Sequence, residues 1–459
     1  MNESIFRAND VRGIVTRDFP DDLVLKLGKA YGSYMKRRGH QTLTVGHDLR
    51  PSSPKLSALF VDGIKSTGLD IHFIGQVTTP ALYFAIHHWN LDGGCMITGS
   101  HNPKSYNGFK MCEGSASVYG KDIQKLKEMI KAEEFELGAG TVEEKDILPE
   151  YLAMLKSKFT FDRPLKIVVD AGNAVAGPIA PKVWREYGHE VIELFCEPDG
   201  NFPNHLPDPC VPGYMRDLAK KVVEEKADIG IGYDGDADRL GAVDDQGRYI
   251  FADRLLVLFA RDVLKRNPGS KIIFDVKCTM ALPEDIRKHG GIPIMWKTGH
   301  SMQKAKLKET GAPFAGELSG HVLFQDDFYG FDDGIYASGR LLQIVAADPP
   351  FSRLIDDVQV FPSTEEIRVD CADEVKFDVV DQLVHDFRKE YNVIDVDGAR
   401  VEFDNGWGLV RPSNTEPNLV VRFEAKSEKR LAEIIRIFID KFAKYPEIKY
   451  SSDKFKKTH

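Results

Sequence analysis

The chain lacks long apolar runs and blocks of basic residues. Its longest uninterrupted apolar stretch, Leu255 to Ala260, is far too short to cross a bilayer, and the opening MNESIFRAND lacks the apolar segment of a secretory signal. Asp plus Glu number 70 against 61 Lys plus Arg, a net charge of −9 that argues against nucleic acid or an anionic membrane as the main partner. We therefore expect a cytoplasmic protein that binds any anionic ligand through a few basic side chains at the binding site.

Paired cysteines are also missing. The six cysteines at positions 95, 112, 196, 210, 278 and 371 show neither a C-x-x-C pair nor the spacing of metal ligands, so we expect buried free thiols. Low-complexity segments are absent as well. The 459 residues, 42% hydrophobic and 29% charged, have the composition of a globular protein and exceed what one core usually fills. The chain should divide into roughly three or four domains.

Strands and helices alternate in three successive rounds. This alternation predicts three related α/β domains with parallel or mixed sheets, in which ligands gather at the carboxyl ends of the strands. The last strand of each round leads into a polar residue, namely Ser100, Asp234 and Glu317, so we expect these side chains to face one centre. The predicted strands are 42–46, 70–74 and 94–98, then 165–170, 190–195 and 228–233, then 271–276, 292–296 and 313–315, with helices at 53–67, 80–89, 178–187, 214–226, 282–288 and 301–310.

The fourth segment has a different pattern. Asp397-Gly398 and Asn405-Gly406 are turn signals between strand-like runs, which predicts an antiparallel sheet and an α+β domain. Its expected strands are 366–369, 393–396 and 419–424, with a helix at 375–391 and a second one that carries Leu431, Ile434, Ile435, Phe438 and Phe442. An acidic boundary at 133–146 and the four patterns together predict domains at 1–145, 146–248, 249–357 and 358–459.

A serine stands at the end of a buried strand, where a nucleophile could act. The stretch TGSHNPKSYNGFK, from Thr98 to Lys110, places Ser100 just after an apolar run. Gly99 would let the backbone approach a ligand closely, and Asn107-Gly108 predicts a turn. An ordinary surface loop is the alternative, which the three letters Ser-His-Asn alone would favour.

Three aspartates, Asp234, Asp236 and Asp238, alternate in the sequence DGDADR. In an extended loop their carboxylates would face one side, and three anions so close repel each other unless a cation neutralises them. Ligands that are all oxygen favour magnesium, calcium or manganese. An EF-hand is disfavoured because Arg239 stands where that loop needs glycine, and a dinucleotide fingerprint is disfavoured because no helix opens there.

A serine near a divalent cation suggests phosphoryl transfer, in which catalysis is mostly positioning and charge neutralisation. Ser100 would carry the phosphoryl group. His101 and Lys110 are candidates either for moving the proton of the hydroxyl or for stabilising charge. Acyl transfer is the alternative, but Gly99-Ser100-His101 lacks the first and last glycines of a nucleophile elbow.

Three further loops carry groups suited to a phosphorylated sugar. Alternating polar residues in GELSGH suit vicinal hydroxyls, although a plain turn with a satisfied glutamate would have the same letters. The loop RPSNTEP offers a planar fork, hydroxyls and an amide, which would hold a phosphate that is not being transferred. The loop KTGH ends the second strand of its round and can reach the same cleft. The candidates are Glu317, Ser319 and His321, then Arg411, Ser413, Asn414 and Thr415, then Lys297, Thr298, Gly299 and His300.

In their order, these motifs resemble those of the α-D-phosphohexomutases, most closely the bacterial phosphomannomutase/phosphoglucomutase group. The resemblance covers essentially the whole chain, through FRANDVRG, TGSHNPKSYNGFK, DGDADR, WKTGHS, GELSGHVLF, YGFDDGIY and RPSNTEPNLVVRFEA. It implies a heart-shaped protein of four domains around a central cleft. It also implies phosphoserine at Ser100, with Mg²⁺ held by Ser100 through its phosphoryl group and by Asp234, Asp236 and Asp238.

The implied reaction is an isomerisation of hexose phosphates, with mannose, glucose or both as the sugar. Phospho-Ser100 would give its group to a hexose 1-phosphate or 6-phosphate, and the resulting 1,6-bisphosphate, which also serves as activator, would reorient and return its other phosphate. The implied partners are small phosphosugars, with no nucleic acid or membrane, and we expect a monomer. By resemblance Arg12, His101, Lys110 and His300 are catalytic, whereas Arg239 joins the three sugar and phosphate loops in binding substrate.

The sequence departs from the family at Asn9, where a tyrosine usually precedes the aspartate, so any contact made by that ring is lost. His321 at the end of GELSGH resembles the dual-specificity and mannose enzymes. Phosphoglucosamine mutase is the nearest rival. A magnesium phosphatase with Asp234 as nucleophile is disfavoured by Asp238, and a non-catalytic sensor of hexose phosphates is disfavoured by the intact Ser100 and aspartates.

Overall fold

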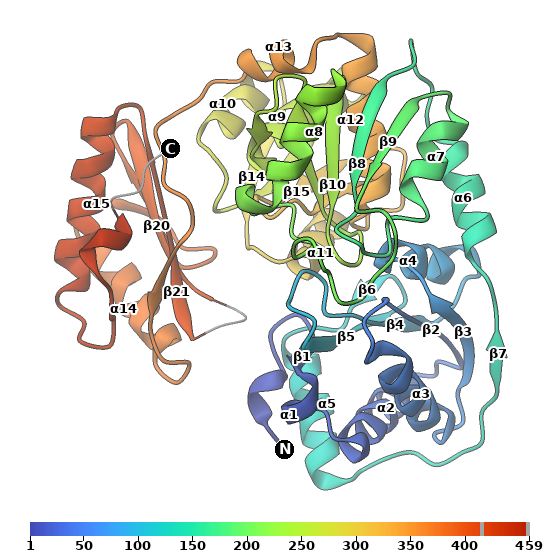
Figure 1. The fold of residues 1–459 in the computed structure, drawn as a ribbon. Helices are drawn as coiled ribbons and strands as arrows, with labels where there is room; N and C mark the ends of the chain where they lie inside the picture. The colour runs from blue at the N-terminus through green and yellow to red at the C-terminus, as the bar shows by residue number, and fades with distance from the viewer. Residues whose placement is uncertain (414–416, 456–459) are drawn as a thin grey trace.

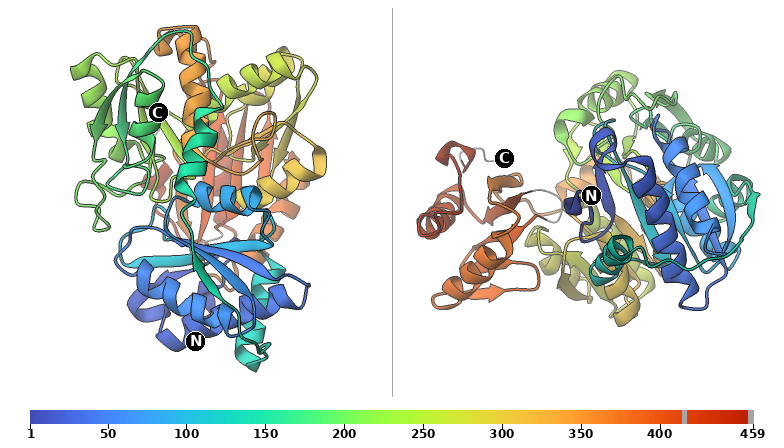
Figure 2. Two further views of the ribbon diagram at one scale, coloured as in Figure 1. Left: turned by 90° about the vertical axis from the view of Figure 1, so that its right-hand side faces the viewer. Right: turned by 90° about the horizontal axis from the view of Figure 1, so that it is seen from below.

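The computed structural model describes residues 1–413 and 417–455. Within these ranges the strands form four sheets, which we use to define a first, a second, a third and a C-terminal unit. Figure 1 shows the first unit at the bottom, the second and third above it, and the C-terminal unit at the left. Seen from below in Figure 2, the C-terminal unit stands to one side of the other three. The predicted class of three α/β domains and one α+β domain is confirmed.

The sheet of the first unit has the strand order β1, β5, β4, β2, β3 and β7, with β6 paired to β5. β2 is parallel to β3 and β4, whereas β5 is antiparallel to β4 and β1. The bounds are β1 (Val11–Ile14), β2 (Thr42–His47), β3 (Asp70–Gln76), β4 (Gly93–Ile97), β5 (Tyr106–Glu113), β6 (Ala116–Ser117) and β7 (Val142–Glu144), with helices α1 (Val15–Asp18), α2 (Asp21–Lys36), α3 (Ser53–Lys65), α4 (Thr79–His88) and α5 (Lys121–Ala132).

The turn expected at Asn107-Gly108 is wrong, because both residues lie within β5. Gly108 pairs with Arg12 on β1, and a Cβ at this glycine would lie 2.7 Å from the carbonyl oxygen of Val11. The glycine is therefore needed for close pairing of two strands rather than for a reversal of the chain.

The second and third units repeat one layout, in which parallel strands are followed by an antiparallel one. In the second unit β8, β9 and β10 are parallel and β11 is antiparallel; in the third, β13, β14 and β15 are parallel and β16 is antiparallel. The bounds are α6 (Leu148–Lys156), β8 (Lys166–Asp170), α7 (Ala180–Glu186), β9 (Glu190–Leu194), α8 (Arg216–Glu225), β10 (Ile229–Tyr233), β11 (Leu240–Asp244) and β12 (Tyr249–Ile250), then α9 (Ala252–Arg266), β13 (Lys271–Asp275), α10 (Ala281–Lys288), β14 (Ile292–Trp296), α11 (His300–Thr310), β15 (Phe314–Gly316), β16 (Val322–Phe324), α12 (Gly334–Ala347) and α13 (Phe351–Asp356).

The C-terminal unit is antiparallel throughout, with the strand order β17, β21, β20, β19 and β18. Its last helix begins at a serine cap, since the Ser427 side chain accepts a hydrogen bond from the Arg430 amide, and it buries the predicted apolar stripe on the sheet. The bounds are β17 (Ile367–Asp370), α14 (Lys376–Arg388), β18 (Asn392–Ile394), β19 (Ala399–Phe403), β20 (Gly406–Pro412), β21 (Asn418–Ala425) and α15 (Glu428–Phe442), and short 3-10 turns cover Glu3–Ile5, Pro212–Met215 and Ser452–Phe455.

The apolar cores show which units share buried packing. The first unit and the C-terminal unit each have a core of their own, and a further cluster of buried residues runs from α4 of the first unit through the second and third units. All six cysteines are free, and five of them are buried. Among the described residues, no helix has both the length and the apolar character needed to cross a membrane.

Candidate active site

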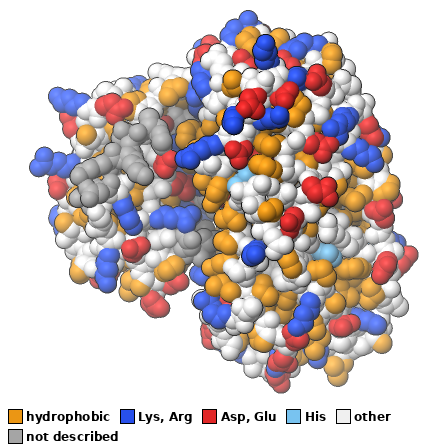
Figure 3. Space-filling model, in the orientation of Figure 1, with side chains coloured by type: hydrophobic (Ala, Val, Ile, Leu, Met, Phe, Trp, Pro, Cys, Tyr) orange, Lys and Arg blue, Asp and Glu red, His pale blue; other side chains and the backbone are white. Residues whose placement is uncertain are grey.

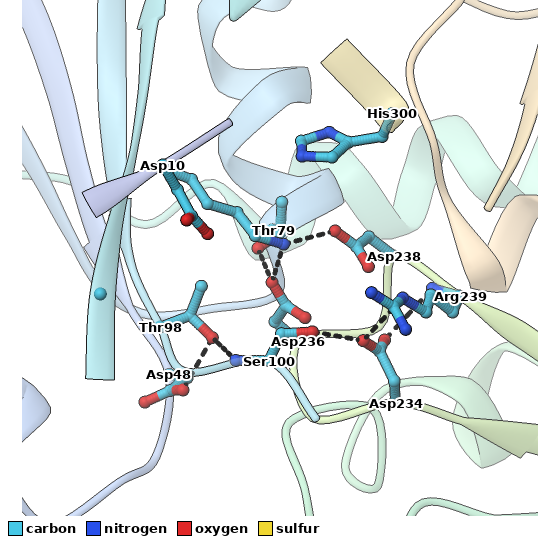
Figure 4. Close-up of polar contacts among 12 residues, drawn as sticks. Asp10, Asp48, Thr79, Thr98, Ser100, Asp234, Asp236, Asp238, Arg239 and His300 are labelled. Carbon is cyan, nitrogen blue, oxygen red and sulfur yellow. Dashed lines mark hydrogen bonds and ion pairs between the residues drawn. The ribbon is translucent and has the colours of Figure 1, made fainter. Parts of the chain in front are cut away.

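Ser100 lies in the loop between β4 and β5 and points toward the loop that carries the aspartates (Figure 4). Its Oγ donates a hydrogen bond to Asp234 Oδ2 at 2.8 Å and lies 3.1 Å from His101 Nδ1. The backbone of Ser100 has a φ of 47°, in the left-handed region that a side chain rarely adopts. The serine is 1% exposed, so its hydroxyl is shielded from bulk water.

Two buried residues, Arg50 and Asp48, form hydrogen bonds with the loop that carries Ser100. The Arg50 guanidinium donates to the carbonyl oxygens of Ser100 at 2.7 Å and Asn102 at 2.6 Å. Asp48 accepts from Thr98 Oγ1 at 2.8 Å and also from Arg50 Nε at 3.1 Å. Because buried charges persist only when paired and hydrogen-bonded, this pair fixes the loop in its strained conformation.

The three aspartates occupy a turn between β10 and β11, not the extended loop expected from their spacing. Residues 235–237 form the turn, and Ala237 has a φ of 63°. One oxygen of each of Asp234, Asp236 and Asp238 lies within 4.8 Å of the others, and all three residues are fully buried. The carboxylates therefore meet because the chain curls, and three acidic groups in this arrangement could bind a metal ion.

Lys110 on β5 neutralises part of this charge. Its ammonium lies 2.6 Å from Asp236 Oδ2 and 2.6 Å from Asp238 Oδ2, and Thr79 Oγ1 donates to Asp236 at 2.6 Å. Within the described part of the chain, Oδ1 of Asp236 and Oδ1 of Asp238 are buried without a hydrogen-bond partner. Two orphaned carboxylate oxygens beside a third acid are an arrangement that a divalent cation fits.

Burial sets the protonation of the groups around Ser100. It raises the pKa of Asp234 well above its usual range, and the charges of Asp238 and Asp236 add to the effect. Burial opposes a charged Asp236 too, but the Lys110 ammonium outweighs it and holds the pKa of that carboxyl well below its usual range. Burial, assisted by nearby arginines, lowers the pKa of His101 well below its usual value, so its imidazole is neutral at pH 7.

The loop after β15 brings Glu317, Ser319 and His321 to the same region. Glu317 accepts hydrogen bonds from the Gly299 amide at 2.9 Å and from Ser319 Oγ at 2.9 Å. His321 accepts from Arg239 Nε at 3.0 Å, which ties the sugar loop to the aspartate loop. Burial raises the pKa of Glu317.

His300, at the start of α11, stacks on His321 with ring centroids 5.2 Å apart. Asp332 lies 2.8 Å from His321 Nδ1, and Lys304 pairs with Asp332 at 2.7 Å. Asp238, His321 and Asp332 form a second group of potential metal ligands, but the Lys304 ammonium already supplies the positive charge there.

Most of the predicted residues from the four units line one cavity. Arg12 on β1 donates to Asn102 Oδ1 at 2.6 Å and pairs with Asp10, which helps to orient it. Asn9, which replaces the usual tyrosine, also lines the cavity, whereas Lys297 is exposed and is not among the lining residues described. The predicted residues in the lining are Arg12, His101, Lys110, Arg239, Thr298, Gly299, His300, Glu317, Ser319, His321, Arg411 and Ser413.

The C-terminal unit contributes Arg411 from the end of β20 and Ser413 just after it. Arg411 Nε donates to Asp397 Oδ2 at 2.8 Å, while the buried Nη2 has no hydrogen-bond partner among the described residues. An unpaired guanidinium nitrogen facing a cavity is suited to an anion. Asn414 and Thr415, predicted for the same phosphate nest, lie outside the described residues.

Sequence reasoning missed several groups at the site. Lys277 follows β13, lines the cavity and pairs with Glu366 of the C-terminal unit at 2.6 Å. Lys277, Asp48 and Arg50 each follow a predicted strand at its carboxyl end, and this shared position was the signal that could have identified them.

The chain belongs to the phosphoglucomutase/phosphomannomutase family. The family's alpha/beta/alpha domains I, II and III match residues 3–137, 149–247 and 251–361, and its C-terminal domain matches residues 366–441.

Individual relatives agree with this assignment. The chain is 46% identical to a phosphomannomutase/phosphoglucomutase of Pseudomonas aeruginosa over 95% of this chain and 94% of that protein. It is 44% identical to a phosphoglucomutase of Neisseria gonorrhoeae over 95% of each. A crystal structure of a phosphoglucomutase/phosphomannomutase family protein from Burkholderia thailandensis superposes with a TM-score of 0.92 at 42% identity, covering 98% of this chain and 100% of that one.

Proposed function

We propose that this chain is a phosphohexomutase that interconverts hexose 1-phosphates and hexose 6-phosphates of mannose, glucose or both. The observation that carries the proposal is the contact of Ser100 Oγ with Asp234 Oδ2 at 2.8 Å, because it sets the hydroxyl beside the three acids. Transfer from a phosphorylated Ser100 to the free hydroxyl of the sugar would give a hexose 1,6-bisphosphate. Return of the other phosphate would complete the isomerisation.

The chain's own residues have separate roles in this reaction. His101 lies beside Ser100 Oγ and is placed to handle the hydroxyl proton, whereas Lys110, bound to Asp236 and Asp238, would stabilise developing charge. Arg12 and His300 line the same cavity as these two residues. Glu317 and Ser319 would bind the sugar hydroxyls from one loop. Arg411 and Ser413, from the C-terminal unit, would hold the phosphate that is not being transferred, whichever end of the sugar carries it.

We further propose that Asp234, Asp236, Asp238 and the Ser100 phosphoryl group hold Mg²⁺. The donor set supports it, because all the ligand atoms are oxygens and two of them are orphaned and buried. Bound there, the ion would neutralise charge on the transferred phosphoryl group. A hexose 1,6-bisphosphate would serve as activator by phosphorylating Ser100.

The setting we propose is a cytoplasmic monomer that works on small phosphosugars, not on nucleic acid or membranes. Six free cysteines fit a reducing compartment. Phosphoglucosamine mutase stays the second candidate, since a probable phosphoglucosamine mutase of Methanopyrus kandleri is 34% identical over 95% of this chain and 97% of that protein.

Conversion of mannose 1-phosphate and, separately, of glucose 1-phosphate to their 6-phosphates tests the function, with magnesium and a trace of the 1,6-bisphosphate present. Comparable kcat/KM for both would establish a dual-specificity mutase. Release of inorganic phosphate without isomerisation would point to a phosphatase, and turnover of neither substrate would make glucosamine phosphate the next substrate to test.

A further inference from the structure

Asp397 links the C-terminal unit to the third unit at the edge of the cavity. It lies in the turn between β18 and β19, and one oxygen, Oδ2, accepts two hydrogen bonds. Arg411 Nε donates to it at 2.8 Å, and the Thr298 amide, which belongs to the third unit, donates to it at 3.0 Å. The Asp397 side chain is 14% exposed and the Arg411 side chain 5%, so water competes little for these bonds.

Thr298 is fixed from its other side by Asp275 at the end of β13. The Thr298 hydroxyl donates to Asp275 Oδ2 at 3.0 Å, and Asp275 Oδ1 accepts from the Leu318 amide at 3.1 Å. Asp275 is fully buried. A continuous set of hydrogen bonds therefore runs from Arg411 through Asp397, Thr298 and Asp275 to the loop that carries Glu317.

Asp397 is not among the residues that line the cavity, so it acts through others. From Arg411 it accepts the Nε–H group alone, so the orphaned Nη2 keeps its N–H groups for another acceptor such as an anion. The five donors of a guanidinium form a rigid planar fork, so a bond that fixes Nε also fixes the direction of the remaining N–H groups.

We propose that Asp397 is a positioning residue that sets the phosphate-binding Arg411 at a fixed place relative to the sugar-binding loops of the third unit. The inference rests on the proposed function, because it assumes that Arg411 binds the phosphate that is not transferred. Loss of Asp397 leaves the binding groups present but unaligned, so substrate binding weakens in the ground state and the transition state alike.

Steady-state kinetics of Asp397→Ala and Asp397→Asn test this with hexose 1-phosphate as substrate. We expect Asp397→Ala to raise KM about tenfold while kcat changes by less than about threefold, the scale of one lost charge-assisted hydrogen bond. Asp397→Asn should fall between wild type and Asp397→Ala, because its amide oxygen can still accept both N–H groups. The matched control is Asp395→Ala, which removes a half-exposed carboxylate two residues away that pairs with Arg388 and should leave KM unchanged.

The direction of the change in KM distinguishes a positioning role of Asp397 from a purely electrostatic one. If Asp397 acted only as a nearby negative charge, its removal would strengthen the attraction of Arg411 for phosphate, and KM would fall. A KM that is unchanged or lower in Asp397→Ala overturns the proposal.

A double-mutant cycle supplies the second test. In an Arg411→Met background, Asp397→Ala should add less than about twofold to KM, because the group it positions is already gone. Full additivity of the two effects would show that Asp397 contributes to general stability instead. Wild-type protein that isomerises no hexose phosphate would contradict the proposed function itself, whereas an active wild type with an unaffected Asp397→Ala would contradict only the positioning role.

Discussion

At the scale of single residues, Ser100 owes its position to Arg50 and Gly235, which are not among the residues that line the cavity. The Arg50 guanidinium holds its carbonyl, and Gly235 of the aspartate loop packs so close to that carbonyl that a Cβ there would collide with it. The serine loop and the aspartate loop are therefore in backbone contact. This contact keeps Ser100 Oγ beside Asp234 even though the residue has a positive φ.

Replacement of Ser100 by alanine tests its role as phosphoryl carrier. We expect Ser100→Ala to lower kcat by about 10⁴-fold or more, the cost of losing a nucleophile that acts together with its neighbours. Phosphate incorporation from a labelled 1,6-bisphosphate, measured by intact mass, should disappear as well. Ser115→Ala, which alters an exposed serine on the following hairpin, is the control and should keep both properties. Near wild-type turnover by Ser100→Ala would contradict the assignment.

For Lys110 we predict that one substitution strengthens the binding of Mg²⁺ and lowers the mutase activity. The Lys110 ammonium lies 2.6 Å from Oδ2 of Asp236 and Oδ2 of Asp238, so it repels a cation bound to the same two carboxylates. Lys110→Met should therefore bind Mg²⁺ about tenfold more tightly by calorimetry, since it removes one positive charge from a buried site. Mutase activity should fall in the same variant.

The control for that measurement is Lys104→Met, an exposed lysine whose bond to Asn201 lies on the surface. It should change neither the affinity for Mg²⁺ nor the activity. Weaker binding of Mg²⁺ by Lys110→Met would mean that the lysine orders the carboxylates rather than repels the cation.

At the scale of elements, His189 joins the starts of β8 and β9 in the second unit. Its Nδ1 accepts a hydrogen bond from the Leu165 amide at 3.0 Å, and the residue is 5% exposed. Burial lowers the pKa of His189 to about 4. The folded protein therefore holds this imidazole neutral where the unfolded chain would protonate it.

The pH dependence of stability follows from that shift. The unfolded histidine takes up its proton near pH 6.5, so the stabilisation is fully present above that pH and is lost as the pH falls toward 4. At pH 5 the loss should be about 2 kcal/mol. Urea unfolding of His189→Gln at pH 7 and pH 5 should show a smaller difference between the two midpoints than wild type does. His385→Gln, an exposed histidine on α14, should keep the wild-type difference.

The sequence predicted the parallel strands of the alternating strand–helix pattern. It did not predict the antiparallel strands that pair with them. The apolar strands β2, β4, β8, β10 and β13 agree with the prediction to within about two residues, because each is buried on both faces. The antiparallel strands β5, β11 and β16 were missed. Each follows a polar loop and takes its pairing from the parallel strand before it, which local pattern does not reveal.

At the active site, too, the sequence predicted individual loops but not the contacts between them. Sequence placed Ser100 and Asp234 on separate loops after parallel strands, and the structure brings the two into contact. Lys277 and Arg50 follow predicted strands, but the sequence did not show which other loops they contact. The curl of the aspartate turn was also hidden, because it depends on a positive φ at Ala237, a residue that seldom adopts one.

At the scale of the whole molecule, the C-terminal unit is joined to the third unit by polar groups and by a small apolar cluster in which Trp407 and Leu409 pack with Val276. Arg400 donates to the carbonyl oxygens of Val276 at 2.6 Å and Cys278 at 2.9 Å, and its guanidinium stacks on Trp407 at 3.8 Å. On the side of the first unit, Arg7 and Asp373 form an ion pair at 3.6 Å beside a groove of about 1410 Å³. Figure 3 shows Lys and Arg side chains along the hollow between the C-terminal unit at the left and the other units.

The separate core of the C-terminal unit predicts that this unit moves relative to the other three. The C-terminal unit has a separate core and meets the third unit through polar groups and one small apolar cluster, so it can rotate as a body. The first unit is held to the second and third by a buried cluster that runs through α4, so these three should stay together. A bisphosphate held at one end by Arg411 and at the other beside Ser100 would draw the C-terminal unit toward the first unit and narrow the groove. Spin labels at Lys125 and Phe377, residues on opposite walls of that groove, should move closer by more than about 2 Å when hexose 1,6-bisphosphate saturates the site.

Two controls make that distance change specific to closure. Labels at Lys125 and Lys55, both in the first unit, should keep their separation with the same ligand, because that unit moves as one body. In Arg411→Met the first pair of labels should no longer respond, since the bisphosphate loses its hold on the C-terminal unit. An unchanged distance in wild type, at a ligand concentration that supports full turnover, would mean that the cleft works without closing and that the Arg7–Asp373 side stays open throughout the reaction.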